Sequence, residues 1–146
     1  LRGRPGAAGR RFVFAEHNAH GPTPKQFYPS RAVRGERFTY IRNLLPKKTY
    51  VPPADLVEHK KWGNLTWDAV QACAGTFPVQ HALARRTLRR PAEELYDRHT
   101  DPHEMTNLLD GGPDALTPPV REELARLRRA IDAWMKATGD AGADLM

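Results

Sequence analysis

Residues 117–139 have the sequence TPPVREELARLRRAIDAWMKATG. Apolar side chains recur in it every three or four positions, which places them in one stripe along a helix. The stripe consists of Val120, Leu124, Leu127, Ile131 and Trp134. Thr117 can cap the first turn and Pro118 suits the first helical position, whereas Gly139 can end the helix. The segment therefore predicts a long amphipathic helix that buries one face against another layer.

The layer that this helix packs against is predicted from four strand-like segments. They are residues 11–16, 31–34, 38–44 and 94–98. Gly35 and Glu36 join the second segment to the third, a spacing typical of a hairpin. Alternation in the third places Phe38, Tyr40 and Arg42 on one face, without deciding which face meets the core. We expect an α+β fold with a four-stranded antiparallel sheet packed against the long C-terminal helix.

Additional short helices are expected in the middle of the chain. They cover residues 54–62, 66–74 and 79–90, and Pro91 stops the last of them. Residues 17–29 are polar and rich in Gly and Pro, which predicts a loop. By this interpretation the chain has three parts. These are a flexible lead or linker at 1–10, one subdomain at 11–138 and a tail at 139–146.

The composition fits one modest soluble domain of 146 residues with a small core. The net charge of +6 is uneven, because residues 1–90 hold 17 Lys or Arg against 5 Asp or Glu, and residues 91–146 hold 6 against 12. The basic half could attract an anionic partner, or could be an ordinary solvated surface. No apolar run approaches the roughly 20 residues that span a bilayer, so no membrane contact is expected. The chain has no secretory signal and no initiator Met, so we expect its true N-terminus to lie upstream.

Two blocks of sequence carry a resemblance to a known protein family. The later block, residues 93–109, is EELYDRHTDPHEMTNLL. The earlier block consists of FVFAEHNAH at 12–20, YPSRAVR at 28–34 and RFTYIRNL at 37–44. These blocks resemble the ELYD…DPxExxNL box and the xEH, YPxRxVR and RxKYIxN segments of sulfatases, the sulfuric ester hydrolases of the alkaline-phosphatase superfamily. The N-sulfoglucosamine sulfohydrolase (sulfamidase) type looks most similar. The resemblance implies a C-terminal sulfatase subdomain that lies beside the active-site cleft and shapes substrate access.

The residues that perform catalysis in sulfatases have no counterpart in this sequence. The family nucleophile lies in a Cys/Ser-x-Pro-x-Arg motif, where it is oxidised to formylglycine, but Cys73 is followed by Ala74 and Gly75. Thr39 stands where the family often has Lys. The resemblance therefore implies no catalytic residue and no metal or cofactor in this chain, which alone should be inactive. Its implied partner is an N-terminal catalytic domain that holds the nucleophile and calcium.

The substrate-binding candidates are His17, His20 and Arg31. The two histidines follow a strand and open a loop, a frequent position for binding groups. They could contact the sugar or sulfate of a substrate, or belong to plain loop structure. A zinc site would lack ligands, since two histidines and Glu16 do not complete its shell. The Arg31 guanidinium suits a tetrahedral oxyanion, although a surface or sheet-packing role is also open.

Two further clusters have structural explanations. Asp101 and Pro102 predict a turn into a short helical segment that Asp101 caps, and Asn107 is placed at the exit of that turn. The basic cluster at 85–90 could hold a polyanion, or could be a solvated helix face. No nucleic-acid motif and no interleaved aromatic side chains accompany it, so no nucleic-acid partner is expected.

The function expected from these observations is that of a sulfatase subdomain. With its companion domain it would act on sulfate esters or N-sulfates of a carbohydrate-like substrate. The alternative is a non-catalytic module that binds an anionic polymer through the basic half of the chain.

Overall fold

The computed structural model describes residues 11–19, 21, 24–50 and 66–144. The predicted lead at 1–10 and the predicted helix at 54–62 lie outside these residues, as does His20. The chain divides into two compact units. The first unit consists of Leu1–Ala15, Arg31–Ile41 and Glu93–Asp140. The second unit consists of Glu16–Ser30, Arg42–Ala92 and Ala141–Met146.

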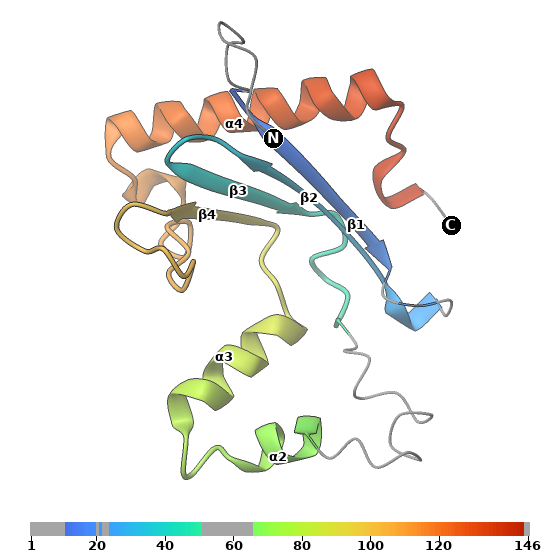
Figure 1. Cartoon of the computed structure of the whole chain (residues 1–146), viewed down its shortest axis with the longest axis vertical. Coiled ribbons are helices and arrows are strands. Elements are labelled where there is room, and N and C mark those ends of the chain that lie inside the picture. Colours follow the sequence, from blue (N-terminus) through green and yellow to red (C-terminus); the bar gives the residue numbers. More distant parts are fainter. Residues whose placement is uncertain (1–10, 20, 22–23, 51–65, 145–146) are drawn as a thin grey trace, which may run out of the picture. The chain divides into compact units, whose positions relative to one another are not determined.

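Four antiparallel strands form one sheet in the order β1-β2-β3-β4 (Figure 1). The strands are β1 (Val13–Ala19), β2 (Phe27–Arg34), β3 (Phe38–Asn43) and β4 (Glu93–Asp97). The backbone N–H of Gly35 donates to the carbonyl of Phe38 at 2.9 Å and closes the turn between β2 and β3. The predicted α+β fold and its hairpin are therefore confirmed.

The loop predicted over residues 17–29 is wrong at both of its ends. Strand β1 continues to Ala19 and β2 already begins at Phe27, after a short 3-10 turn at Pro24–Gln26. The prediction followed the polar composition together with Gly21, Pro22 and Pro24, which favour a loop. Within β2, Pro29 has no N–H to donate, but its carbonyl accepts the N–H of Leu44 at 3.0 Å.

Three α-helices are described. Helices α2 (Thr66–Ala72) and α3 (Pro78–Leu88) pack together in the second unit, and α4 (Pro118–Thr138) belongs to the first. Single 3-10 turns occur at Pro113–Ala115 and Gly142–Asp144. None of the helices in the described residues is long and apolar enough to cross a membrane.

Helix α4 begins and ends where its sequence predicts. Thr117 precedes it in an extended conformation, and Pro118 occupies the first helical position. Gly139 ends it with φ of 66°, in the left-handed region that costs glycine little. Its N–H donates to the carbonyl of Lys136 at 3.3 Å, and the next N–H, of Asp140, donates to Met135 at 2.9 Å.

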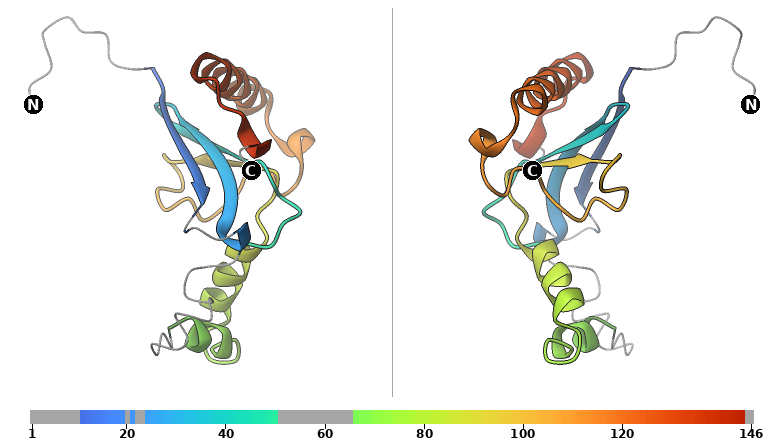
Figure 2. Two further views of the ribbon diagram at one scale, coloured as in Figure 1. Left: turned by 90° about the vertical axis from the view of Figure 1, so that its right-hand side faces the viewer. Right: turned by 90° about the vertical axis from the view of Figure 1, so that its left-hand side faces the viewer.

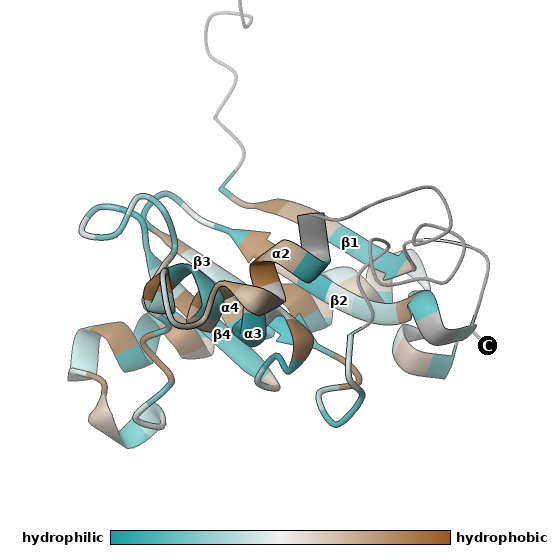
Figure 3. Ribbon diagram, turned by 90° about the horizontal axis from the view of Figure 1, so that it is seen from below, coloured by the Kyte–Doolittle hydropathy of each residue, from teal (hydrophilic) through white to brown (hydrophobic). Residues whose placement is uncertain are grey.

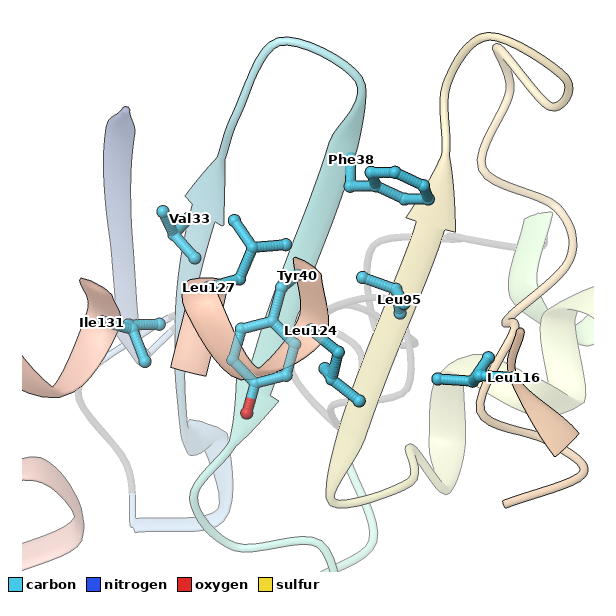
Figure 4. Packing of buried hydrophobic residues seen from close by; sticks show 8 residues of the cluster. All are labelled: Val33, Phe38, Tyr40, Leu95, Leu116, Leu124, Leu127 and Ile131. Atoms are coloured by element: carbon cyan, nitrogen blue, oxygen red, sulfur yellow. The ribbon is translucent and has the colours of Figure 1, made fainter. Parts of the chain in front are cut away.

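The core of the first unit lies between α4 and one face of the sheet (Figures 2 and 4). It consists of Val33, Phe38, Tyr40, Leu95, Leu116, Leu124, Leu127 and Ile131. The face of β3 that meets the core is thus the one with Phe38 and Tyr40. Each leucine or isoleucine of this set stabilises the fold by about 1.5–3 kcal/mol relative to an exposed position. Trp134 extends the packing by stacking on Phe14, with ring centroids 5.3 Å apart.

Strand β1 changes from apolar to polar along its length (Figure 3). Its first residues, 13–15, belong to the first unit, and the preceding Phe12 packs against the core cluster. Residues 16–18 are Glu, His and Asn and belong to the second unit. The polar end of β1 therefore carries the first predicted site residue.

Candidate functional site

His17 lies within β1 rather than in a loop. Its side chain is half-buried, and Nδ1 lies 3.3 Å from the backbone oxygen of Tyr28 on the neighbouring strand. A carbonyl oxygen can only accept, so this hydrogen bond assigns a proton to Nδ1. In the neutral ring Nε2 is then the acceptor, the form suited to receive a hydroxyl proton. The contact with Tyr28 thus joins the His17 ring to the neighbouring strand.

Two tyrosines and an arginine gather in the same unit as His17. The rings of Tyr28 and Tyr50 meet edge to face, with centroids 5.6 Å apart. The Arg90 guanidinium carbon lies 4.8 Å from the Tyr50 centroid and 5.4 Å from that of Tyr28. We call His17, Tyr28, Tyr50 and Arg90 the strand-end cluster. Tyr28 is fully buried and Tyr50 is half-buried, so the cluster places the Arg90 cation, which suits an oxyanion, beside the partly exposed Tyr50 ring.

Arg90 is the residue of this cluster best suited to bind an anion. Within the described part of the chain its guanidinium has ring contacts but no carboxylate partner. Its N–H donors are therefore not committed to an acidic side chain. Sequence reasoning placed Arg90 in a basic cluster and missed its association with Tyr50. Only the fold brings these two residues together.

Arg31 has different surroundings and belongs to the first unit. It is 1% exposed, and its Nη2 donates to Oδ1 of Asp140 at 2.7 Å, while Nε donates to Oδ2. The fork of the guanidinium is thus occupied by the carboxylate that follows the end of α4. This is the geometry of the sheet-packing alternative. The predicted substrate contact of Arg31 stays a prediction.

The segment after β4 is a closed loop, so the predicted short helix after Pro102 is wrong. The Asp101 carboxylate accepts the N–H of Thr106 at 2.7 Å, and no helix follows it. Glu104 adopts a left-handed φ of 53°, which is uncommon for a residue with a side chain. Its Oε1 accepts from the Thr39 hydroxyl at 2.7 Å and from Arg34 Nη2 at 2.9 Å. Thr39 therefore serves as a donor that ties this loop to the sheet.

Several arginines of the first unit have carboxylate partners. Arg37 donates to Asp97 at 2.9 Å, and this hydrogen bond lowers the pKa of Asp97 to about 2. Arg128 donates to Glu93 at 2.8 Å, and that contact raises the pKa of the guanidinium. An open groove in this unit is lined by residues that include Arg34, Glu36, Glu123 and Arg126. Its cations are balanced by nearby carboxylates, so it offers little net attraction to an anion.

Among the residues that the structure describes, no three His, Cys, Asp or Glu side chains converge as a metal site. The Cys73 thiol donates to the carbonyl of Val70 at 3.0 Å. This contact is local, because the two residues are three positions apart, and it involves a backbone carbonyl rather than a side chain that could remove the thiol proton. In the described part of the chain, Cys73 therefore has no neighbouring base of the kind that activates a nucleophile.

Comparisons with known proteins relate this chain to sulfatases. No protein-family model matches it. It is 32% identical over 120 residues to an ulvan-active sulfatase of Formosa agariphila, a match over 75% of this chain and 17% of that protein. A second ulvan-active sulfatase of the same organism is 30% identical over 129 residues, which cover 88% of this chain and 22% of that protein. The chain thus spans about a fifth of the length of these curated relatives.

A similar solved structure is that of a 2-O GAG sulfatase. It is 19% identical, with a TM-score of 0.48, over 92% of this chain and 18% of that chain. By its sequence matches, this chain is related to part of a sulfatase.

Proposed function

We propose that this chain is the C-terminal subdomain of a sulfatase that acts on a sulfated carbohydrate. The observation that carries the proposal is the sequence match to two ulvan-active sulfatases, of which the matched segments make up 17% and 22%. Sulfate ester hydrolysis needs a nucleophile, charge stabilisation and an acid for the leaving group. The chain lacks the Cys/Ser-x-Pro-x-Arg motif, so a companion N-terminal domain would supply the nucleophile and calcium.

In this proposal the chain holds and orients the substrate. The strand-end cluster would receive it, with Arg90 donating to a sulfate oxygen and the half-buried Tyr50 ring bordering the sugar. His17 would contact a sugar hydroxyl, and the substrate contact predicted for His20 stays part of the proposal. Arg31 would contribute indirectly, because its buried pair with Asp140 fixes the end of α4.

Whether the substrate carries a sulfate ester or an N-sulfate is also part of the proposal. The resemblance to the sulfamidase type favours an N-sulfate, whereas the relatives are named for activity on ulvan. Neither His17 nor Arg90 distinguishes an ester from an N-sulfate, since both kinds of group present the same sulfate oxygens to Arg90 and His17 would contact a sugar hydroxyl. Assays should therefore include O-sulfated and N-sulfated oligosaccharides.

The test begins with the coding sequence upstream of Leu1, where we expect a Cys/Ser-x-Pro-x-Arg motif. The 146-residue chain alone should not hydrolyse an aryl sulfate, whereas the protein with the companion domain should. In that protein His17→Ala and Arg90→Ala should raise KM for a sulfated oligosaccharide about tenfold and change kcat little, which corresponds to about 1.4 kcal/mol of binding. Arg129→Ala, an exposed position on α4, is the matched control. Turnover by the isolated chain would contradict the proposal.

A non-catalytic module that binds an anionic polymer is the second candidate. The observation in its favour is the charge of residues 1–90, which hold 17 Lys or Arg against 5 Asp or Glu. An upstream region without the nucleophile motif would favour this candidate over the first.

A further inference from the structure

Helix α3 carries a row of basic side chains on one side. His81, Arg85 and Arg89 follow one another at intervals of four residues, the last at the C-terminal cap of the helix. Four residues advance a helix by about 6 Å and return to nearly the same face, so the row extends over roughly 12 Å. Arg85 and Arg89 are exposed, and His81 is half-buried. We call these three residues the α3 row.

The α3 row lies in a stretch of sequence without acidic side chains. Residues 69–92 contain no Asp or Glu. In the described part of the chain, neither Arg85 nor Arg89 has an ion pair or a side-chain hydrogen bond. The first unit differs, because five of its arginines have carboxylate partners. These are Arg31, Arg34, Arg37, Arg126 and Arg128.

Folding of α3 does not explain this arrangement. No residue of the helix is buried, so the row does not direct an apolar face into a core. Like charges four residues apart, as at Arg85 and Arg89, destabilise a helix by a few tenths of a kcal/mol. The helix dipole favours cations in the last turn and offsets part of that cost. An anion that bridges the two arginines would remove the repulsion.

The C-terminal end of the row is fixed to the strand-end cluster within the second unit. The N–H of Tyr50 donates to the carbonyl of Leu88 at 2.8 Å. Arg90, directly after the row, stacks on the Tyr50 ring. A ligand held by the cluster could therefore continue along α3. A ligand of that length with repeated negative charges is a polymer rather than one sulfate group.

We propose that the α3 row is a docking strip for a sulfated polysaccharide, which it holds outside the reacting sugar. Guanidinium groups bind tetrahedral oxyanions through two N–H donors, and successive sulfates would meet successive cations of the row. The statement that this polymer is also the substrate rests on the proposed function. Binding of the polymer to the α3 row does not rest on it, because the residues that would bind all belong to the second unit.

The test measures binding of dextran sulfate to the 146-residue chain, with neutral dextran as the uncharged reference. The double variant Arg85→Ala and Arg89→Ala should weaken the affinity about tenfold and make it less dependent on salt, since fewer counterions are released. The matched control removes the same charge from α4 by Arg129→Ala and Lys136→Ala, and should change the affinity less than twofold. Far-UV circular dichroism and urea unfolding should be the same for both variants, because all four side chains are exposed.

Four results would overturn the proposal. Equal losses in the two double variants would mean that net charge alone matters. Equal binding of neutral dextran would exclude the oxyanion contact. Tighter binding of single-stranded DNA than of dextran sulfate would assign the strip to nucleic acid, and binding of only phosphatidylserine vesicles would assign it to a membrane surface. Because no turnover is measured, a positive result remains valid if the companion domain proves to lack sulfatase activity.

Discussion

The side-chain oxygen of Asn107 accepts a hydrogen bond from the backbone N–H of Leu95 at 2.9 Å, although 12 residues separate them. The same oxygen accepts the N–H of Leu109 at 3.1 Å. Its amide nitrogen donates to the carbonyl of Glu93 at 3.4 Å and to the carboxylate of Asp110 at 3.1 Å. One buried side chain thus fastens the loop after β4 to the outer side of that strand.

Replacing Asn107 by Ala should lower the free energy of unfolding by about 2–3 kcal/mol, because the buried N–H of Leu95 loses its acceptor. Urea unfolding followed by circular dichroism measures the change. Thr106→Ala is the control, since its side chain is exposed, and should stay within about 0.5 kcal/mol of the parent chain. Equal effects of the two substitutions would show that the Asn107 bonds do not stabilise the loop.

Removing Asp140 should take from the buried Arg31 guanidinium the carboxylate to which its Nε and Nη2 donate. We expect Asp140→Ala to cost about 3–5 kcal/mol, the usual penalty for breaking a buried pair from one side. The double variant Arg31→Met and Asp140→Leu should cost much less than the sum of its two single substitutions. A double-mutant cycle in urea tests this expectation, and additive costs would mean that the two residues act independently.

The stability of the chain should depend on pH through Asp97. Its pKa of about 2 lies below the ordinary value of about 3.9, mainly because Arg37 donates to it. The unfolded state therefore binds more protons between these values. The stabilisation is present above about pH 4 and is lost as the pH falls toward 2.

Urea unfolding of the parent chain and of Asp97→Asn at pH 7, 4, 3 and 2 measures this contribution. The difference in stability between the two proteins should shrink as the pH falls, and Arg37→Ala should show the same trend. A difference that stays constant from pH 7 to pH 2 would contradict the assignment.

Local patterns were sufficient to predict α4 and the β2–β3 hairpin. The helix depends on apolar spacing, and Leu124, Leu127 and Ile131 are all buried as that spacing requires. The start of β2 depends instead on burial of Phe27 and Tyr28 by distant parts of the chain. A short polar sequence that contains Pro29 gives no local sign of that burial.

The candidate site was harder to predict than the fold, because tertiary contacts bring its residues together. Arg31 meets Asp140 across 109 residues, and no periodicity connects two positions so far apart. The association of Arg90 with Tyr50 likewise accompanies a contact between distant positions, in which the Tyr50 N–H donates to the Leu88 carbonyl at the end of α3. Asp101 was assigned to a helix because an aspartate before a proline suits both a helix cap and a turn. Its bond to Thr106 closes a loop instead.

The two outermost strands of the sheet differ in whether they can recruit another strand. On β4 the Asn107 side chain occupies the N–H of Leu95, and the N–H of Leu108 donates to the Leu95 carbonyl at 2.9 Å. On the opposite margin, no segment of the described chain pairs with the outer side of β1. Unpaired strand margins are templates for β-augmentation. A strand supplied by another molecule, or by further polypeptide of the same protein, would therefore extend the sheet beside β1 and not beside β4.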